Sequence, residues 1–302
     1  MVNSATFELL ESPNWQDYEL LDTGEGQKLE RYGAYKFLRP EPQAMWKRAL
    51  SERDWGSAQA VFQPGGEESG GHWSLRSKIP ERWQMSYPLR GAGDRLRFWA
   101  MTTPGRHLGV FPEVAAHWDF VADLLQKAAR PLKVLNLFGY TGLASLAAAA
   151  AGAQVTHVDA SKRSVAWARE NQTLSGLEAK PIRWIVDDAL KFVQREGRRG
   201  VRYDGIILDP PKFGRGPKGE VWEVFESLPT LMEACRQVLS ERPLFAIVTL
   251  YAVKTSALHV GQALHEITAN HPGRIGIGEL VTRERSAGRL LSQAVYARWQ
   301  AD

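Results

Sequence analysis

The chain has 302 residues, a length that allows two domains with a core each. Its single cysteine excludes a disulfide scaffold, and without a long apolar run or an N-terminal apolar segment we expect a cytoplasmic protein that does not enter a membrane. The net charge of +4 is modest for this length and favours an anionic partner such as RNA only weakly.

The first hundred residues have the pattern of a strand-rich domain. Apolar runs separated by Asn, Asp, Gly and Pro predict five short strands, at residues 7–10, 18–21, 32–38, 83–89 and 96–101. The glycine-rich stretch 56–75 predicts an exposed loop. We expect residues 1–104 to form a small β-rich domain that serves either as a platform for a substrate or as a lid and dimerisation element. Its nearly balanced charge lacks the positive surface of a dedicated RNA-binding module.

A second domain is predicted over residues 105–302, with residues 102–113 as the hinge. Apolar residues at helical spacing predict a helix after the hinge, namely Val114, Trp118, Val121 and Leu125. Near the end of the chain we expect helices at residues 220–239 and 258–270, and strands at 244–250, 275–282 and 293–299. Together with the strands described next, these complete an approximately seven-stranded α/β sheet.

The stretch at residues 134–142 begins the part of the chain that carries function. Its apolar run, its glycine-bearing turn and the alanine-rich segment 143–153 predict strand, turn and helix, and a second strand ends on Asp159. In such a βαβ unit Gly139 and Gly142 let the backbone approach a ligand, and Asp159 can accept hydrogen bonds from both hydroxyls of a ribose. The spacing departs from Gly-x-Gly-x-x-Gly, which argues against NAD. The alternative is a close-packed turn that binds no ligand.

Two more strands are predicted to end in acidic residues. The strand at residues 182–186 ends before Asp187 and Asp188, and another apolar strand ends at Asp209, which two prolines follow. Since ligands in an open α/β sheet lie beyond the carboxyl ends of the strands, we expect Asp159, Asp188 and Asp209 to line one site. Alternatively, Asp187 or Asp188 caps the helix that follows.

Two motifs, Asn136-Leu-Phe-Gly-Tyr-Thr-Gly142 and Asp209-Pro-Pro-Lys-Phe213, stand in this order in the chain. Over about residues 105–302 the chain resembles the class I S-adenosylmethionine-dependent methyltransferases. The resemblance is greatest to the group related to the bacterial large-subunit ribosomal RNA methyltransferases, which share Asn-x-Phe-x-Tyr-Thr-Gly and Asp-Pro-Pro-x-Phe. It implies a Rossmann-like, seven-stranded methyltransferase sheet that binds S-adenosylmethionine.

The resemblance also implies which residues contact the cofactor. Asp159 would hold its ribose, near the helix at residues 162–174 that Ser161 is expected to cap, and Asp188 would lie near its adenine. In related enzymes a Gly-x-Phe-x-(Asp/Glu) element closes over the cofactor, which points to Phe111 and Glu113; inter-domain packing and a first-turn acid are the alternatives. The predicted cofactor-binding residues are Phe111, Glu113, Phe138, Gly139, Tyr140, Thr141, Gly142, Asp159, Ala160, Ser161, Asp187, Asp188, Ala189 and Asp209.

The second motif predicts how a target base is held. Asp209 and the carbonyl oxygen of Pro210 can accept hydrogen bonds from the amino group of a base, and Phe213 can stack on its ring. These three are the predicted catalytic residues. Basic residues flank Phe213 in a glycine-rich segment, which we expect to be a flexible loop suited to a nucleotide substrate: Lys212, Arg215 and Lys218.

The position of the single cysteine limits which atom of a base can be methylated. Methylation at C5 of a pyrimidine needs a thiolate, and the relatives that methylate cytosine there carry a cysteine just after the fifth strand. Residues 248–255 contain none, and Cys235 lies in an apolar helical pattern. We therefore predict methylation of a base nitrogen in ribosomal or other structured RNA, with a small molecule or a protein side chain as the alternative substrate. No spacing typical of metal ligands occurs, so we expect no metal, and the sequence leaves a homodimer open.

Overall fold

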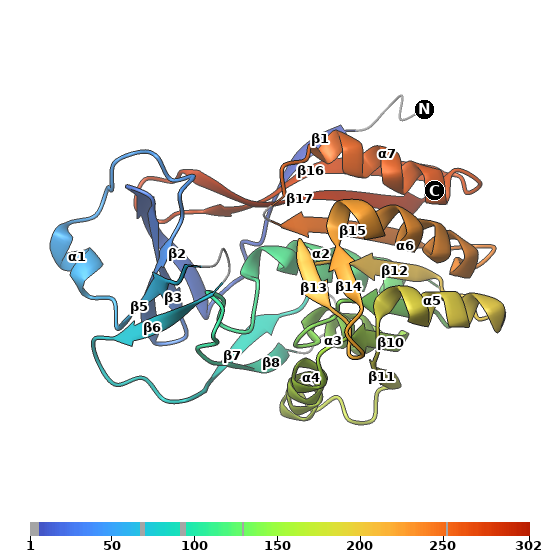
Figure 1. Ribbon diagram of the computed structural model, residues 1–302, viewed down its shortest axis with the longest axis horizontal. Coiled ribbons are helices and arrows are strands. Elements are labelled where there is room, and N and C mark those ends of the chain that lie inside the picture. Colours follow the sequence, from blue (N-terminus) through green and yellow to red (C-terminus); the bar gives the residue numbers. More distant parts are fainter. Residues whose placement is uncertain (1–5, 67–69, 91–94, 129, 252) are drawn as a thin grey trace.

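The computed structural model describes residues 6–66, 70–90, 95–128, 130–251 and 253–302. One large sheet with helices on both faces lies beside a smaller part built mostly of strands (Figure 1). The predicted α/β class with a small β-rich N-terminal part is confirmed. No helix within the described ranges is both long and apolar enough to cross a membrane.

The large sheet has eight strands in the order β1, β16, β17, β15, β12, β9, β10, β11. Their bounds are β1 (Thr6–Glu11), β9 (Lys133–Leu137), β10 (Gln154–Asp159), β11 (Ile182–Val186), β12 (Gly205–Leu208), β15 (Phe245–Tyr251), β16 (Gly273–Arg283) and β17 (Leu290–Ala301). Strands β9 to β12 and β15 run parallel, since a helix connects each to the next, whereas β17 is antiparallel to both of its neighbours.

The first strand of the chain lies in the large sheet. The sequence pattern places β1 in the small domain, yet its residues pair in parallel with β16, so that Thr6 lies opposite Gly276 and Glu11 opposite Val281. The seven expected strands are thus present with an eighth at the edge. The division of the chain at residue 104 stays a prediction.

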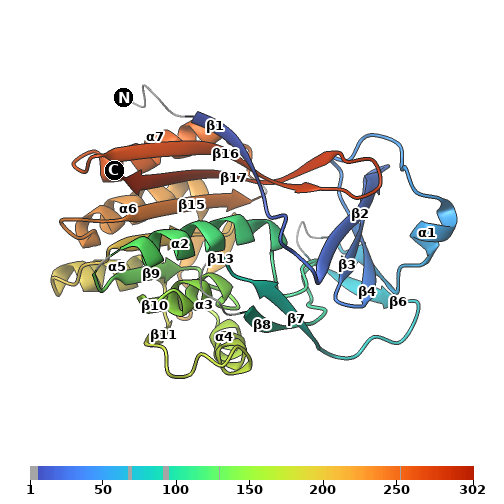
Figure 2. The same cartoon turned by 180° about the vertical axis from the view of Figure 1, so that it is seen from behind.

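Six helices in the described chain cover the large sheet. On one face lie α2 (Ala115–Lys127), α3 (Leu143–Ala150) and α4 (Lys162–Leu174), and on the other lie α5 (Ala189–Arg198), α6 (Val224–Val238) and α7 (Ala257–Thr268) (Figures 1 and 2). The predicted helix at 162–174 and the predicted strand at 182–186 have the same bounds in the structure. Ser161 caps α4 as expected, because its hydroxyl accepts a hydrogen bond from the Ser164 amide at 3.1 Å.

The described residues of the small part form two sheets and one short helix. Five strands form the first sheet: β2 (Tyr18–Gly24), β3 (Gln27–Tyr32), β4 (Tyr35–Pro40), β5 (Ala60–Pro64) and β6 (Gly71–Leu75). The second sheet pairs β7 (Trp83–Pro88) with β8 (Arg95–Ala100), and α1 (Glu52–Gly56) precedes β5. The strands predicted at 83–89 and 96–101 are therefore confirmed.

Two predictions for the small part are wrong. Residues 32–38 do not form one strand, because Gly33, with φ of +62°, turns the chain between β3 and β4. The stretch 56–75 is not only a loop, since it contains β5 and β6. A Cβ atom on Gly71 would lie 2.5 Å from the Phe62 ring, so glycine here allows the two strands to pack closely.

A third correction concerns the segment after Asp209, which is a hairpin instead of a flexible loop. Strand β13 (Phe213–Arg215) pairs with β14 (Val221–Glu223) in antiparallel register. Trp222 fixes the hairpin, because its Nε1 donates to the Pro211 carbonyl oxygen at 2.7 Å and its ring centroid lies 4.8 Å from that of Phe138.

The tip of the β16–β17 hairpin extends from the large sheet into the small part (Figure 1). There Arg289 pairs with Asp22 at 3.2 Å and with Glu284, whose carboxylate also accepts a hydrogen bond from Thr23. Asp22, Thr23 and Glu284 are buried. The two parts are therefore connected by a buried ionic network.

Candidate active site

A cavity of about 650 Å³ lies at the carboxyl ends of β9, β10, β12 and β15, and residues of the small part close its other side. Its volume is within the range of small-molecule and cofactor sites. The predicted site residues that line it are Phe111, Glu113, Phe138, Gly139, Tyr140, Thr141, Asp159, Ala160, Ser161, Asp187, Asp188, Ala189, Asp209 and Pro210. Gly142 and Phe213 are not among the lining residues.

The turn after β9 is held by the acid at the end of β10. Phe138 and Tyr140 adopt left-handed backbone conformations, with φ of +57° and +47°, which side chains of their size rarely adopt. The amides of Tyr140 and Ser161 donate to the two oxygens of the Asp159 carboxylate, each at 2.8 Å. Each oxygen keeps a second lone pair for a ligand. Burial raises the pKa of Asp159, despite these two hydrogen bonds.

Both glycines of this turn are explained by packing. A Cβ atom on Gly139 would lie 2.4 Å from the His157 ring, and one on Gly142, with φ of +84°, would lie 2.7 Å from the Ala168 Cβ atom of α4. Close packing, the alternative that the sequence left open, therefore requires glycine at both positions. Gly139 also lines the cavity, while a contact between Gly142 and a ligand stays a prediction.

The two acids after β11 have structural partners as well as places in the cavity wall. Asp188 caps α5, since its Oδ1 accepts from the Lys191 amide at 2.9 Å. One oxygen of Asp187 accepts from the Asp188 amide at 2.9 Å, and the other pairs with Arg195. The helix-capping alternative therefore holds for Asp188, and it leaves this residue at the carboxyl end of the strand where the ligand site is expected.

Asp209 lines the cavity, is half-buried and has a raised pKa. Burial raises its pKa to about 8, and the negative charge of Glu113 adds to this. Glu113, on the short 3-10 turn η1 (Pro112–Val114), is buried, and burial raises its pKa too. Neither carboxylate forms an ion pair with any described residue. Burial, Glu113 and Asp209 together raise the pKa of Tyr251 well above 10.

The sequence pattern misses the wall that the small part contributes. Arg39 donates to both oxygens of Glu30, at 2.6 and 2.7 Å, and also to the hydroxyl oxygen of Tyr32 at 2.9 Å. Lys28 pairs with Glu41 at 3.0 Å. Burial alone would raise the pKa of Glu30, but Arg39 and Lys28 hold it below its usual value. Period-two spacing of Lys28, Glu30 and Tyr32 along β3 was the local signal for a shared face.

A histidine of the hinge joins the cavity to the turn after β9. The Tyr140 hydroxyl lies 3.1 Å from His107 Nδ1, and burial lowers the pKa of His107 to about 4. The imidazole is therefore neutral, and its tautomer decides which of the two groups donates the hydrogen bond. The His107 ring also contacts Phe111, whose ring contacts Tyr251. Phe111 therefore packs at the hinge and lines the cavity at the same time.

The only cysteine does not take part in the site. Cys235 is fully buried on α6, and burial raises the pKa of its thiol to about 12, which disfavours a thiolate. It does not line the cavity. Among the described residues no cluster of His, Cys, Asp and Glu has the arrangement needed to hold a metal ion.

Comparison with known proteins gives a family match over the part of the chain that contains all the predicted site residues. Residues 89–240 match the model of a family described as S-adenosylmethionine-dependent methyltransferase. The ribosomal RNA large subunit methyltransferase K/L of Shewanella baltica (strain OS155 / ATCC BAA-1091) is 38% identical over 98 residues, which is 32% of this chain and 13% of that protein. The ribosomal RNA large subunit methyltransferase I of Klebsiella pneumoniae (strain 342) is 36% identical over 105 residues, 34% of this chain and 24% of that protein. The chain thus matches only about a quarter or less of these relatives.

Solved structures match over the whole chain. The crystal structure of an S-adenosylmethionine-dependent methyltransferase from Agrobacterium tumefaciens is 44% identical, with a TM-score of 0.91 and coverage of 100% of this chain and 98% of that one. A methyltransferase structure complexed with S-adenosylhomocysteine, SMU.776, shares the fold at 20% identity, with a TM-score of 0.69 and coverage of 95% and 76%.

Proposed function

Because this chain belongs to the S-adenosylmethionine-dependent methyltransferase family, we propose that it methylates a base nitrogen in ribosomal or other structured RNA in the cytoplasm. The observation that carries this proposal is Asp209, a half-buried acid with a raised pKa next to Pro210 at the end of β12, in the same cavity as the turn after β9. The ribosomal RNA methyltransferases that the chain resembles over a third of its length support RNA as the substrate class.

The residues of the cavity fit S-adenosylmethionine. The cofactor carries positive charge. Glu113 is buried and Asp209 half-buried; both have raised pKa values and no ion pair in the described chain, so a cation would stabilise their charged forms. The Asp159 carboxylate retains acceptor capacity for ribose hydroxyls, and Asp188 lies at the next strand end for the adenine. When bound, the cofactor supplies a methyl group on a positively charged sulfur.

The chain must also orient the target nitrogen and accept its proton. In the ionised state, Asp209 can accept a hydrogen bond from an amino group at one Oδ atom, and a second can go to the Pro210 carbonyl oxygen. A methylated amino nitrogen loses one proton, and a carboxylate whose pKa lies near 8 can hold it at that Oδ atom. Burial of Cys235 outside the cavity leaves no thiolate for chemistry at C5.

The ring that would pack on the target base needs to be reassigned. Phe213, predicted for this task, is 56% exposed and does not line the cavity. Trp222, on the opposite strand of the same hairpin, does line it and is held by the Pro211 carbonyl oxygen. We therefore propose that Trp222 supplies the aromatic wall beside Asp209.

One observation favours a different substrate class. The wall of Lys28, Glu30, Tyr32 and Arg39 is buried and its polar groups are mutually paired, which suits a closed pocket for a small polar molecule. A small-molecule methyltransferase is therefore the second candidate.

The two candidates are separated by following the methyl group. Purified protein and methyl-labelled S-adenosylmethionine are added to an extract of cells that lack this gene, and the extract is divided into RNA, protein and small molecules. We expect label in RNA, and at most background label with Asp209→Ala. Label confined to small molecules would replace the RNA proposal by the second candidate.

A further inference from the structure

The hairpin beside Asp209 presents an exposed apolar face. Three of the large exposed apolar side chains of the described chain fall within residues 213–225: Phe213 at 56%, Val221 at 62% and Phe225 at 55% exposure. The register pairs Phe213 with Glu223 and Arg215 with Val221, so these four side chains share one face of the hairpin. Gly214 and Trp222 lie on the other face and line the cavity, and Arg215 also reaches the cavity rim, whereas Phe213 and Val221 do not line it.

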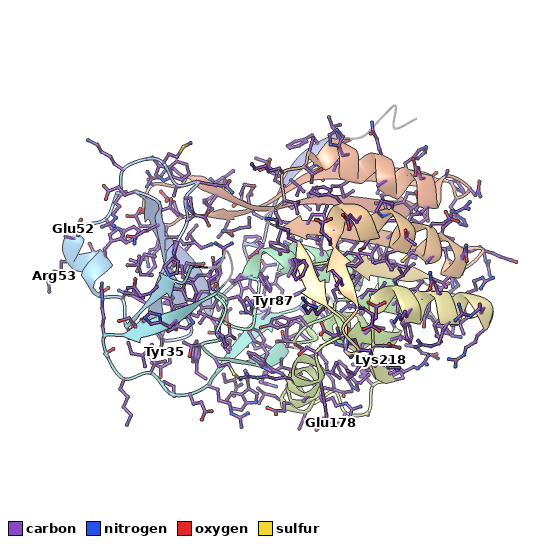
Figure 3. The ribbon with its side chains drawn as sticks, in the orientation of Figure 1. Tyr35, Glu52, Arg53, Tyr87, Glu178 and Lys218 are labelled. Atoms are coloured by element: carbon purple, nitrogen blue, oxygen red, sulfur yellow. The ribbon has the colours of Figure 1, made fainter. Side chains whose placement is uncertain are left out.

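Two cations of this face are exposed and unpaired in the described chain. Arg215 and Lys218 form no ion pair within the described residues, and Lys218 lies at the turn of the hairpin on the surface (Figure 3). Of the nearby acids, Glu226 is also exposed, whereas Glu220 and Glu223 have partners. Glu220 pairs with Lys191 at 2.6 Å, and the Glu223 carboxylate accepts from the amides of Phe225 and Glu226 at the start of α6.

The exposed face of the hairpin lies next to Asp209, the predicted catalytic acid. The Trp222 Nε1 bond to the Pro211 carbonyl oxygen fixes the hairpin two residues after Asp209. A strand of RNA whose target base enters the cavity must continue outward past the rim of that cavity. Exposed aromatic rings interspersed with Arg and Lys are what single-stranded nucleic acid needs, because bases stack on the rings and phosphates approach the cations.

We propose that an outer hairpin surface, made of Phe213, Arg215, Lys218 and Val221 on the hairpin and Phe225 at the start of α6, binds the single-stranded nucleotides that flank the target base. The inference rests on the proposed function and adds to it the path of the RNA outside the cavity. Phe213 then stacks on a neighbouring base instead of the target. The apolar area and the uncompensated cations together favour RNA over a second copy of this chain, since two copies would bring like charges together.

The test compares two double variants with equally exposed apolar residues. Val221→Ser with Phe225→Ala changes the outer hairpin surface, and Phe7→Ala with Leu9→Ser, at 56% and 51% exposure on β1, changes the edge of the large sheet. Binding of a fluorescein-labelled 12-nucleotide single-stranded RNA of mixed sequence is measured by anisotropy, and S-adenosylhomocysteine binding by calorimetry. We expect the hairpin variant to bind the RNA at least about tenfold more weakly, the β1 variant to bind it within twofold of the wild type, and both to keep their cofactor affinity.

The outcomes separate this inference from the function on which it rests. Unchanged RNA affinity of the hairpin variant, with an RNA-binding and RNA-methylating wild type, would overturn the outer hairpin surface and leave the proposed function intact. A wild type that neither binds nor methylates RNA would overturn both. A wild-type dimer that the same two hairpin substitutions turn into a monomer would assign the face to a second copy of the chain and overturn its role in RNA binding.

Discussion

Acidic side chains on the two walls of the cavity have pKa values shifted in opposite directions. On the wall formed by the large sheet and the hinge, Asp209 and Glu113 have no ion pair in the described chain, and burial raises their pKa values. On the wall formed by the small part, Glu30 is buried as fully as Glu113, yet a bidentate Arg39 lowers its pKa. An unpaired buried acid is costly and is typical of functional sites, whereas a paired one maintains shape. The first wall is therefore suited to change its protonation with a ligand, and the second is a fixed scaffold.

The largest effect should follow from breaking the scaffold wall. Arg39→Met leaves Glu30 buried without its partner, which we expect to cost about 3 to 5 kcal/mol of unfolding free energy, measured by urea titration. Because the folded pKa of Glu30 lies below its ordinary 4.5, its stabilising effect is present above that pH and is lost as the pH falls. The difference in unfolding free energy between the wild type and Arg39→Met should therefore become smaller in acid.

The matched control for this loss is a solvent-exposed pair. Arg236→Met removes the 2.7 Å contact with Glu233, whose side chain is about half exposed, and should leave the unfolding free energy unchanged. Equal losses for Arg39→Met and Arg236→Met would mean that burial does not distinguish the scaffold wall.

The next effect concerns the wall that changes protonation. Asp209→Asn keeps the shape of the side chain but cannot take up a proton, so methyl transfer should fall about 10²- to 10³-fold. Because the pKa of Asp209 is raised to about 8 without the cofactor, its carboxyl group is mostly protonated at pH 7, and kcat/KM of wild-type transfer should increase as the pH rises through about 8. The Asn variant should lack this step. An identical pH profile in the variant would exclude Asp209 as the group that titrates.

A smaller loss is expected at the ribose site. Asp159→Asn should weaken S-adenosylmethionine binding about 10- to 100-fold in calorimetry, because a charged acceptor is lost. Asparagine is the better test than alanine, since it keeps one of the two oxygens that accept from the Tyr140 and Ser161 amides, whereas alanine would remove both and release the turn. Thermal unfolding serves as the control for the fold. Unchanged affinity would contradict the ribose assignment.

The smallest effect should come from the link between the hinge and the turn. Tyr140→Phe removes one hydrogen bond to the neutral His107 ring, which we expect to cost about 1 kcal/mol of unfolding free energy. Cofactor binding should weaken only severalfold. A loss as large as that of Arg39→Met would show that the hinge belongs to the fixed scaffold as well.

The contrast between the walls also explains which parts of the site were predictable. The bounds of α4 and β11 follow from local signals, a capping serine, helical spacing and a short apolar run. Asp159, Asp188 and Asp209 were expected to meet because parallel strands place their carboxyl ends at one edge of a sheet.

The remaining features depend on contacts between distant segments. Lys28 contacts Gln293, 265 residues away, and β1 pairs with β16 at the other end of the chain. Neither contact leaves a local pattern. The side of the hairpin on which Phe213 points is set by the register of two three-residue strands, and a shift of one residue would reverse it. A sequence motif can therefore identify this position without placing its side chain.

The most direct test of the central claim is to identify the methylated nucleoside. Total RNA from cells lacking the gene is incubated with the purified protein and methyl-labelled S-adenosylmethionine, digested to nucleosides and separated by chromatography with mass spectrometry. The account predicts a labelled nucleoside methylated on a base nitrogen, absent with Asp209→Asn. A labelled 5-methylpyrimidine, or RNA without label while another fraction of the cell extract is labelled, would contradict it.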